Sequence, residues 1–160
     1  MIEKKSYAKV NIFLKIAGKR DNYHEIVSRF VRVHSLYDVV RFEKGEFDKF
    51  TLEGVFGCET EKNTIYKAYL ELYSMFKNIE EIFKNYKVVV EKNIPEFAGL
   101  GGGSSNCAIF MLMVNILGNL KLSPDELASI GAKIGADVPF FIYEYDSANV
   151  TRIWGSCRKV

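Results

Sequence analysis

Residues Pro95 to Asn106 read P-E-F-A-G-L-G-G-G-S-S-N, and this stretch decides the fold. Gly99 and the run Gly101–Gly103 come just before two hydroxyls and an apolar segment suited to a helix. Without Cβ atoms the backbone turns tightly and brings N–H groups against a bulky oxyanion, and the following helix points its positive end at the same place. Ser104 and Ser105 can cap that helix or bind phosphate and a metal ion. The stretch therefore predicts a cradle for nucleotide phosphates, against the alternative of a flexible loop that merely begins a helix.

The glycine-rich stretch fits neither of two common nucleotide motifs. It lacks the Gly-Lys-Ser/Thr ending of a Walker-type loop, and it lacks the G-x-G-x-x-G spacing of a dinucleotide-binding unit. It resembles the P-x-x-x-G-L-G-S/G-S-S-x motif of the GHMP kinase superfamily, named after galactokinase, homoserine kinase, mevalonate kinase and phosphomevalonate kinase. That resemblance implies that ATP is bound by Pro95, Ala98, Gly99, Leu100, Gly101, Gly102, Gly103, Ser104 and Ser105.

Bulk composition excludes several classes of protein. The 160 residues are enough for one domain with a proper core, and 22 Lys plus Arg against 20 Asp plus Glu give no nucleic-acid signature. Three widely spaced cysteines predict neither a zinc site nor a disulfide framework, which favours a reducing compartment. The N-terminus lacks the apolar core of a signal peptide, and the longest apolar run, 108–114, falls far short of the roughly 20 residues of a membrane span. We expect a soluble cytoplasmic protein without a membrane partner.

Hydrophobic periodicity predicts an alternation of strands and helices. Residues 9–16 alternate strictly, with Val10 and Ile12 on the apolar face and Lys9 and Asn11 as a polar pair on the other. Further strands are expected at 26–33, 37–42, 86–90 and 138–143, with 50–52 as another candidate. Helices are expected after the cap residue Asn63, over 104–117, and from the capping box at 123–126 to Gly135.

This order predicts a single α+β domain over residues 1–150. The resemblance implies the N-terminal, ATP-binding domain of a GHMP kinase, a ribosomal-protein-like fold with a left-handed βαβ unit. Residues 151–160 depart from the family pattern and form an atypical tail. Because the family continues into a second domain that closes over the substrate, we expect a truncated chain, lacking the C-terminal domain, that turns over poorly or not at all. Rates typical of the family from these 160 residues would refute that expectation.

Two further segments carry the family likeness. The segment 8–14, A-K-V-N-I-F-L, resembles the family's A-K-[LIV]-N-L-x-L opening, and 135–139, G-A-D-V-P, resembles its catalytic segment. Taken alone, Lys9 fits an exposed strand lysine and Asp137 a turn or capping aspartate. The likeness implies that Asp137 is the general base and Lys9 its electrostatic partner.

Other positions are implied to contact the two substrates. The segment 21–25, D-N-Y-H-E, resembles the part of the family that packs around a cytosine. Tyr23 offers a flat face for stacking, His24 can pair with a base edge, and Asn11 adds a polar contact; the alternative for Tyr23 and His24 is the end of a hairpin. Asn63 and Lys92 match positions that line the adenine and ribose pocket.

Some residues depart from the family pattern or leave its details open. Glu96 and Phe97 replace a small polar residue and a glycine, so an acid lies at the mouth of an anion site and opposes nucleotide binding unless it faces solvent or a metal ion. Cys107 replaces an alanine and reads as a small core residue. No cluster of protein ligands predicts a metal site, so Mg²⁺ is expected on the phosphates, with Ser105 as a candidate ligand.

The reading that the resemblance favours is an ATP-dependent kinase of isoprenoid-precursor synthesis, acting on a small alcohol that carries a cytidine diphosphate group. A GHMP kinase for a different alcohol is one alternative. A non-catalytic nucleotide- or RNA-binding module on the same fold is another, although no stripe of Arg and aromatic residues supports it.

Overall fold

The strands form one mixed sheet whose central member is β2. The computed structural model describes residues 2–20, 23–151 and 156–159, with side chains described for 2–13 and 27–150. β2 (Tyr23–Lys44) pairs antiparallel with β1 (Ile2–Arg20) along most of its length, while β4 (Tyr86–Glu91) pairs with residues 39–44 of β2 and β5 (Ser147–Thr151) with residues 27–31. β3 (Leu52–Gly54) extends the sheet parallel to β4, and β6 (Ser156–Lys159) extends it beside β5. β2 therefore links the β3–β4 end of the sheet to the β5–β6 end.

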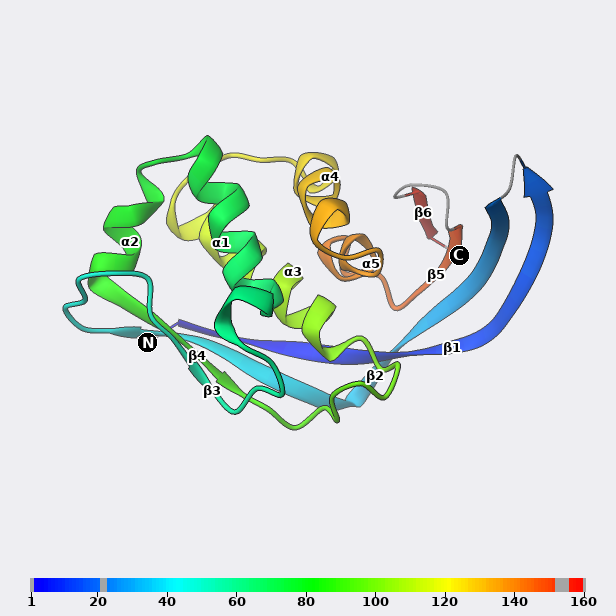
Figure 1. The fold of residues 1–160 in the computed structure, drawn as a ribbon, viewed down its shortest axis with the longest axis horizontal. Helices are drawn as coiled ribbons and strands as arrows, with labels where there is room; N and C mark the ends of the chain where they lie inside the picture. Colours follow the sequence, from blue (N-terminus) through cyan, green and yellow to red (C-terminus); the bar gives the residue numbers. More distant parts are fainter. Residues whose placement is uncertain (1, 21–22, 152–155, 160) are drawn as a thin grey trace.

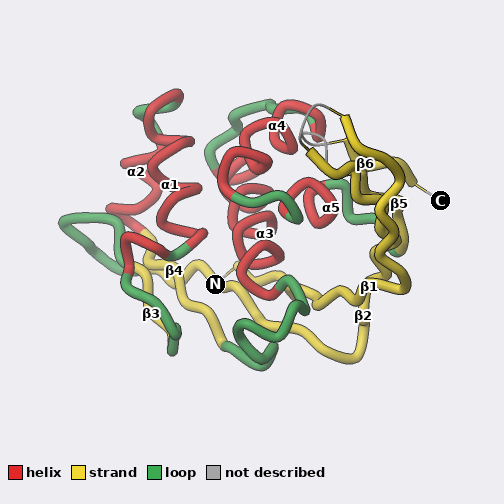
Figure 2. The backbone as a smooth tube through the Cα atoms, turned by 45° about the vertical axis from the view of Figure 1, so that its right-hand side comes forward, coloured by secondary structure: helices red, strands yellow, loops and turns green. Residues whose placement is uncertain are grey.

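The helices pack on one face of this sheet (Figure 1). They are α1 (Thr64–Met75), α2 (Ile79–Asn85), α3 (Gly102–Leu117), α4 (Pro124–Ile134) and α5 (Val138–Ile142), with a short 3₁₀ turn, η1 (Thr60–Lys62), before α1. Figures 1 and 2 both place α3 between α1 and α5. A layer of helices on a sheet is the α+β arrangement that the sequence predicts.

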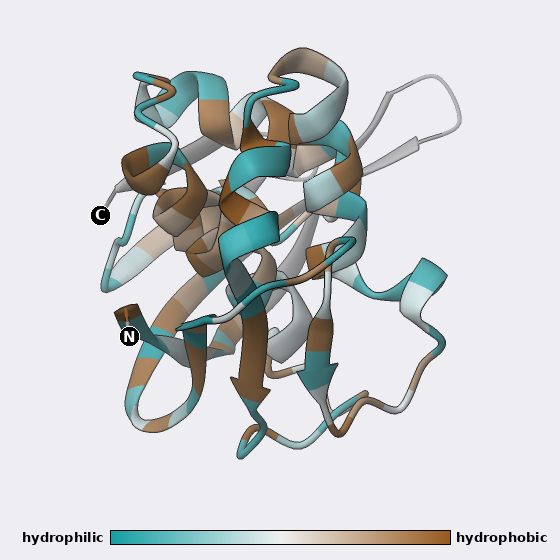
Figure 3. Cartoon of the chain, turned by 90° about the vertical axis from the view of Figure 1, so that its left-hand side faces the viewer, coloured by the Kyte–Doolittle hydropathy of each residue, from teal (hydrophilic) through white to brown (hydrophobic). Residues whose placement is uncertain are grey.

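Local sequence signals explain where the helices begin. The side chain of Asn63 accepts a hydrogen bond from the Ile65 N–H at 2.9 Å and caps α1. Ser123 and Glu126 form the predicted capping box of α4, and Gly135 follows its last residue. Figure 3 shows polar and apolar stretches alternating on the helices nearest the viewer, as expected for helices with one buried face. The predicted cap at Asn63, the predicted capping box and the predicted end of α4 at Gly135 are confirmed.

The core lies between α3 and the sheet and is rich in phenylalanine. The ring centroids of Phe42, Phe83 and Phe110 lie 5.7 to 5.9 Å apart, and all three side chains are buried. Each contributes about 1.5–3 kcal/mol by leaving water. Cys107 is buried in α3, as expected for a small core residue, and burial raises the pKa of its thiol.

The structure corrects the prediction for residues 138–143. They form the helix α5 and not a strand, with Pro139 in its first turn, and all five residues of the helix are buried. An apolar run buried on every side has no periodicity that separates a strand from a helix, and a proline in the first turn favours the helix.

Four strand predictions change in detail. The strands expected at 26–33 and 37–42 are parts of the single strand β2, and the candidate at 50–52 is displaced to β3. In β1 the expected apolar face is not uniformly buried, because Ile12 is 61% exposed whereas Lys9 is only 4% exposed. Irregularities in the β1–β2 register after Tyr7 and Asn11 change which residues face the helices.

The parallel strands β3 and β4 are joined through α1 and α2, which makes a βαβ unit. The left hand of this connection stays a prediction. The expected tail falls partly on residues 152–155 and 160, which lie outside the described residues. Within the part of the chain that the structure describes, no helix has the length and apolarity to cross a membrane.

Candidate functional site

A cleft of about 1210 Å³ opens between the glycine-rich loop, the loop before α1 and the middle of β1. Most residues predicted for the site line it: Lys9, Asn11, Asn63, Lys92, Pro95, Ala98, Gly99, Leu100, Gly101, Gly102, Gly103, Ser104 and Asp137. Apart from Asn63, the sequence reading did not single out the loop before α1, which contributes Phe56, Gly57, Cys58, Glu59 and Lys62. Thr64, the first residue of α1, lines the cleft as well. The structure thus brings segments from both ends of the chain to one place.

The glycine-rich loop adopts a backbone that requires glycine at two positions. Gly99 and Gly101 have φ angles of 75° and 72°, in the left-handed region. A Cβ atom at Gly101 would lie 3.1 Å from Cγ of Lys9 and 3.0 Å from Cζ of Phe141, so space as well as φ excludes a side chain there. Gly101 is also the residue before α3, whose first amides open into the cleft.

Lys9 is held against the glycine-rich loop by its main chain and its side chain. Its backbone N–H donates to the Leu100 carbonyl at 2.9 Å. Its ammonium donates to Oδ1 of Asn11 at 2.7 Å and lies 4.2 Å from the centroid of the Phe30 ring. The lysine and asparagine that share a strand face in the sequence are therefore in direct contact.

Asp137 supplies the negative partner of Lys9. Its Oδ2 lies 3.3 Å from the Lys9 Nζ, and the two side chains are 19% and 6% exposed. Asp137 precedes α5, but its side chain makes no capping hydrogen bond with that helix. This contradicts the alternative of a merely capping aspartate. A partly exposed carboxylate beside an ammonium, at the edge of a cleft, can accept a proton from a bound hydroxyl.

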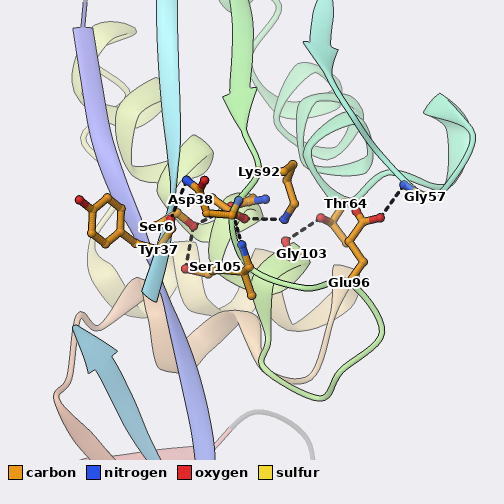
Figure 4. Close-up of polar contacts among 12 residues, drawn as sticks. Ser6, Tyr37, Asp38, Gly57, Thr64, Lys92, Glu96, Gly103 and Ser105 are labelled. Atoms are coloured by element: carbon orange, nitrogen blue, oxygen red, sulfur yellow. Dashed lines mark hydrogen bonds and ion pairs between the residues drawn. The ribbon is translucent and has the colours of Figure 1, made fainter. Parts of the chain in front are cut away.

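A buried aspartate that the sequence reading missed secures the start of the loop. Asp38 in β2 is fully buried, and its Oδ2 accepts a hydrogen bond from the Lys92 Nζ at 2.5 Å. Its Oδ1 accepts from the N–H groups of Asn93 and Ile94 at 2.6 and 2.8 Å. Lys92 lines the cleft with its position fixed by this carboxylate (Figure 4).

Ser105 lies beneath the cleft and does not line it. It is 1% exposed, and its hydroxyl lies 2.8 Å from that of Ser6, which donates to Oδ1 of Asn106 at 2.7 Å. The hydroxyl considered as a metal ligand is thus engaged with β1, and Ser104 is the serine that faces the cleft. Among the described residues no group of three His, Cys, Asp or Glu side chains is placed to hold a metal ion.

Two hydrogen bonds join the loop before α1 and the start of α1 to the glycine-rich loop and the start of α3 (Figure 4). The hydroxyl of Thr64 donates to the Gly103 carbonyl at 2.7 Å, and the N–H of Gly57 donates to Oε2 of Glu96 at 2.6 Å. Asn63, predicted to contact adenine, lines the cleft while its Oδ1 caps α1. The acid that appeared misplaced in the sequence is thus a hydrogen-bond acceptor between two walls of the cleft.

The predicted cytosine contacts remain untested. Tyr23 and His24 begin β2, but their side chains, like all of residues 21 and 22, lie outside what the structure describes. Asn11, predicted with them, is exposed next to Lys9. For Asp38 and Glu96 the sequence holds no local signal, because their partners come from distant segments.

Comparison with known proteins agrees with these observations. Over 145 residues the chain is 56% identical to the 4-diphosphocytidyl-2-C-methyl-D-erythritol kinase of Sulfurovum sp. (strain NBC37-1), covering 91% of this chain and 57% of the relative. It is 42% identical over 152 residues to the enzyme of that name from Campylobacter jejuni subsp. jejuni serotype O:6, covering 92% and 59%. The chain thus spans somewhat more than half the length of these curated relatives.

Solved structures and a family profile extend the comparison. The structure resembles that of a 4-(cytidine 5'-diphospho)-2C-methyl-D-erythritol kinase, with a TM-score of 0.78 and 29% identity over 99% of this chain and 55% of the other. A mevalonate kinase, at 17% identity over 100% and 56% of the two chains and a TM-score of 0.71, shares the fold. The family model described as "GHMP kinases N terminal domain" matches residues 63–145, more than half of the sequence. The chain therefore belongs to the GHMP kinase family, whose N-terminal domain it carries.

Proposed function

We propose that this protein is an ATP-dependent kinase that phosphorylates the 2-hydroxyl of 4-diphosphocytidyl-2-C-methyl-D-erythritol. The observation that carries the proposal is the Lys9–Asp137 ion pair, which lies against the glycine-rich loop in one cleft. The names of the most similar relatives supply the acceptor alcohol. Members of the family that share only the fold point to no particular alcohol.

The residues of the cleft fit a nucleoside triphosphate. Gly101, Gly102 and Gly103 present backbone amides without Cβ atoms, and the positive end of α3 faces the same space. Lys92 adds a charge next to these amides, since a Cβ atom at Gly102 would lie 3.4 Å from its Nζ. Mg²⁺ bound through phosphate oxygens would neutralise part of the negative charge.

Phosphoryl transfer would use Asp137 and Lys9 as follows. The acceptor hydroxyl gives its proton to the Asp137 carboxylate while its oxygen forms a bond to the γ-phosphorus. The bond from that phosphorus to the β–γ bridging oxygen breaks, and ADP leaves. Lys9 pairs with the carboxylate before the reaction and stabilises the charge on the transferring group. Tyr23, His24 and Asn11 would hold the cytidine end of the acceptor.

Replacing Asp137 by Asn in the full-length protein tests this function. We expect kcat to fall by about 10²- to 10⁴-fold, as for the loss of a general base, with the Kd for ATP nearly unchanged. Asp146→Asn is the matched control, because Asp146 is exposed and paired with His34, away from the cleft. A coupled ADP-release assay and calorimetry give the two quantities.

Three outcomes would contradict the proposal in different ways. A D137N protein that turns over at the normal rate would show that Asp137 is not the general base. Activity on alcohols without a cytidine group would favour another GHMP kinase. Failure of the unmodified protein to bind ATP would remove the nucleotide site altogether.

A further inference from the structure

The cleft has two facing walls that are joined at two points. One wall is the loop 55–63 before α1, and the other is the glycine-rich loop 95–103. At one point Thr64, the first residue of α1 directly after the loop 55–63, donates to the Gly103 carbonyl in the first turn of α3; at the other, the Gly57 N–H donates to Glu96 (Figure 4). The Glu96 bond is short, at 2.6 Å, and has a charged acceptor, which is the stronger kind of hydrogen bond.

The contact at Gly57 leaves no room for a side chain as long as Glu96 keeps its position. A Cβ atom there would lie 2.4 Å from Oε2 of Glu96 and 3.1 Å from Cε2 of Phe97. Phe97 itself has a φ of 58°, which is rare for a bulky residue, and is 90% exposed. Burial therefore does not stabilise this strained residue, whereas its backbone conformation places Glu96 and the Phe97 ring against Gly57.

The charge of Glu96 and its hydrogen bond act in opposite directions on a nucleotide. A carboxylate lining a cleft for triphosphate repels it, so the charge alone would weaken binding. The hydrogen bond fixes the loop 55–63, which otherwise has to be ordered when the nucleotide binds, at a cost in conformational entropy. Glu96 favours nucleotide binding if the free energy gained by ordering the loop in advance is larger than the free energy lost to charge repulsion.

We infer that Glu96 is a positioning residue for the nucleotide, which acts through Gly57 by holding the loop 55–63 in its binding conformation. The inference rests on the proposed function, because it takes ATP as the ligand of the cleft. It predicts that losing the acceptor oxygen has a larger effect on nucleotide binding than losing the negative charge. It also predicts that the loop is ordered before ATP arrives.

Two substitutions at Glu96 separate the oxygen from the charge. Glu96→Ala removes both and is expected to raise the KM and Kd for ATP about fivefold, as for a lost hydrogen bond, with kcat unchanged. Glu96→Gln keeps an acceptor oxygen and is expected to stay within about twofold of the unmodified protein or to bind more tightly. Glu61→Ala is the matched control, since Glu61 is an exposed acid of the same loop outside the cleft. Amide hydrogen exchange at Gly57, without ATP, is expected to speed up only in Glu96→Ala.

The results of these experiments distinguish the inference about Glu96 from the proposed function on which it rests. Tighter ATP binding by both Glu96 variants would show that the charge dominates and would overturn the inference. Unchanged Gly57 exchange in Glu96→Ala would overturn it as well, even with ATP binding intact. An unmodified protein that binds no ATP would instead overturn the proposed function, and the inference with it.

Discussion

Asp38 should be one of the most sensitive positions for stability. Replacing it by Ala removes one oxygen that accepts from the Lys92 ammonium and another that accepts from the N–H groups of Asn93 and Ile94. Breaking a buried ion pair by removing one partner costs about 3–5 kcal/mol, because the other charge is left uncompensated. For a domain whose unfolding free energy is of the order of 5–15 kcal/mol, this is a large fraction.

Asp38→Asn should isolate the ion pair from the backbone contacts. Its oxygen can still accept from Asn93 and Ile94, whereas its NH₂ group meets the Lys92 ammonium, a donor facing a donor. We expect a loss of about 2–3 kcal/mol, smaller than for Ala because the two amides keep an acceptor. Adding Lys92→Met to Asp38→Asn removes the unpaired charge and should recover part of the loss.

Urea unfolding followed by circular dichroism measures these differences. Asp48→Ala is the control, because Asp48 is exposed and a surface substitution should change the unfolding free energy by no more than about 0.5 kcal/mol. The reasoning is refuted if Asp38→Ala costs less than about 1 kcal/mol. It is also refuted if the double variant is no more stable than Asp38→Asn.

Three further predictions concern the loop, a helix cap and the thiols. Gly101→Ala should weaken ATP binding and lower stability by about 1–3 kcal/mol in thermal unfolding, and more than Gly99→Ala, where φ is also positive but a Cβ meets no atom within 4 Å. Hydrogen bonds from the N-cap serine of α4 lower the pKa of the Glu126 carboxyl, so the stability they give is present above about pH 4.3 and is lost as the pH falls through the lowered pKa; Glu126→Gln should flatten this part of the acid-unfolding curve. Peptide mapping after alkylation of the folded protein should find Cys58 modified and Cys107 intact, because Cys58 is exposed whereas burial raises the Cys107 pKa.

The sequence was most informative where chemistry depends on residue type. A φ near 75° strongly favours glycine, so the tight turns at Gly99 and Gly101 can be predicted from the local sequence. The contact of Lys9 with Asn11 follows from their spacing in a strand. The contact between Lys9 and Asp137 came only from the resemblance to a family, since nothing local joins two residues so far apart.

The errors have equally physical causes. The run from Val138 to Ile142 is apolar throughout because it is buried on all sides. It therefore has no alternation of apolar and polar residues that would distinguish a strand from a helix. Ser105 was expected near the phosphates because a hydroxyl next to a glycine loop is common in phosphate sites, whereas its contact with Ser6, from the other end of the chain, has no signal in the local sequence. Glu96 looked unfavourable until the position of Gly57 was known.

The Lys9–Asp137 contact also limits when this molecule can acquire its chemistry during biosynthesis. One partner lies near the start of the chain and the other near the last strands of the sheet, so the ribosome must produce almost the whole domain before the pair can form. At about 5–20 residues per second, the stretch between them takes roughly 6 to 26 s to make. In the first part of that interval, before β4 has been made, the β1–β2 hairpin can form while the edge of β2 that β4 and β5 will cover is open; the segment that β5 covers stays open to the end of the interval. A nascent chain of this protein therefore exposes a strand edge, at which strands of other chains can pair, before the Lys9–Asp137 contact can form.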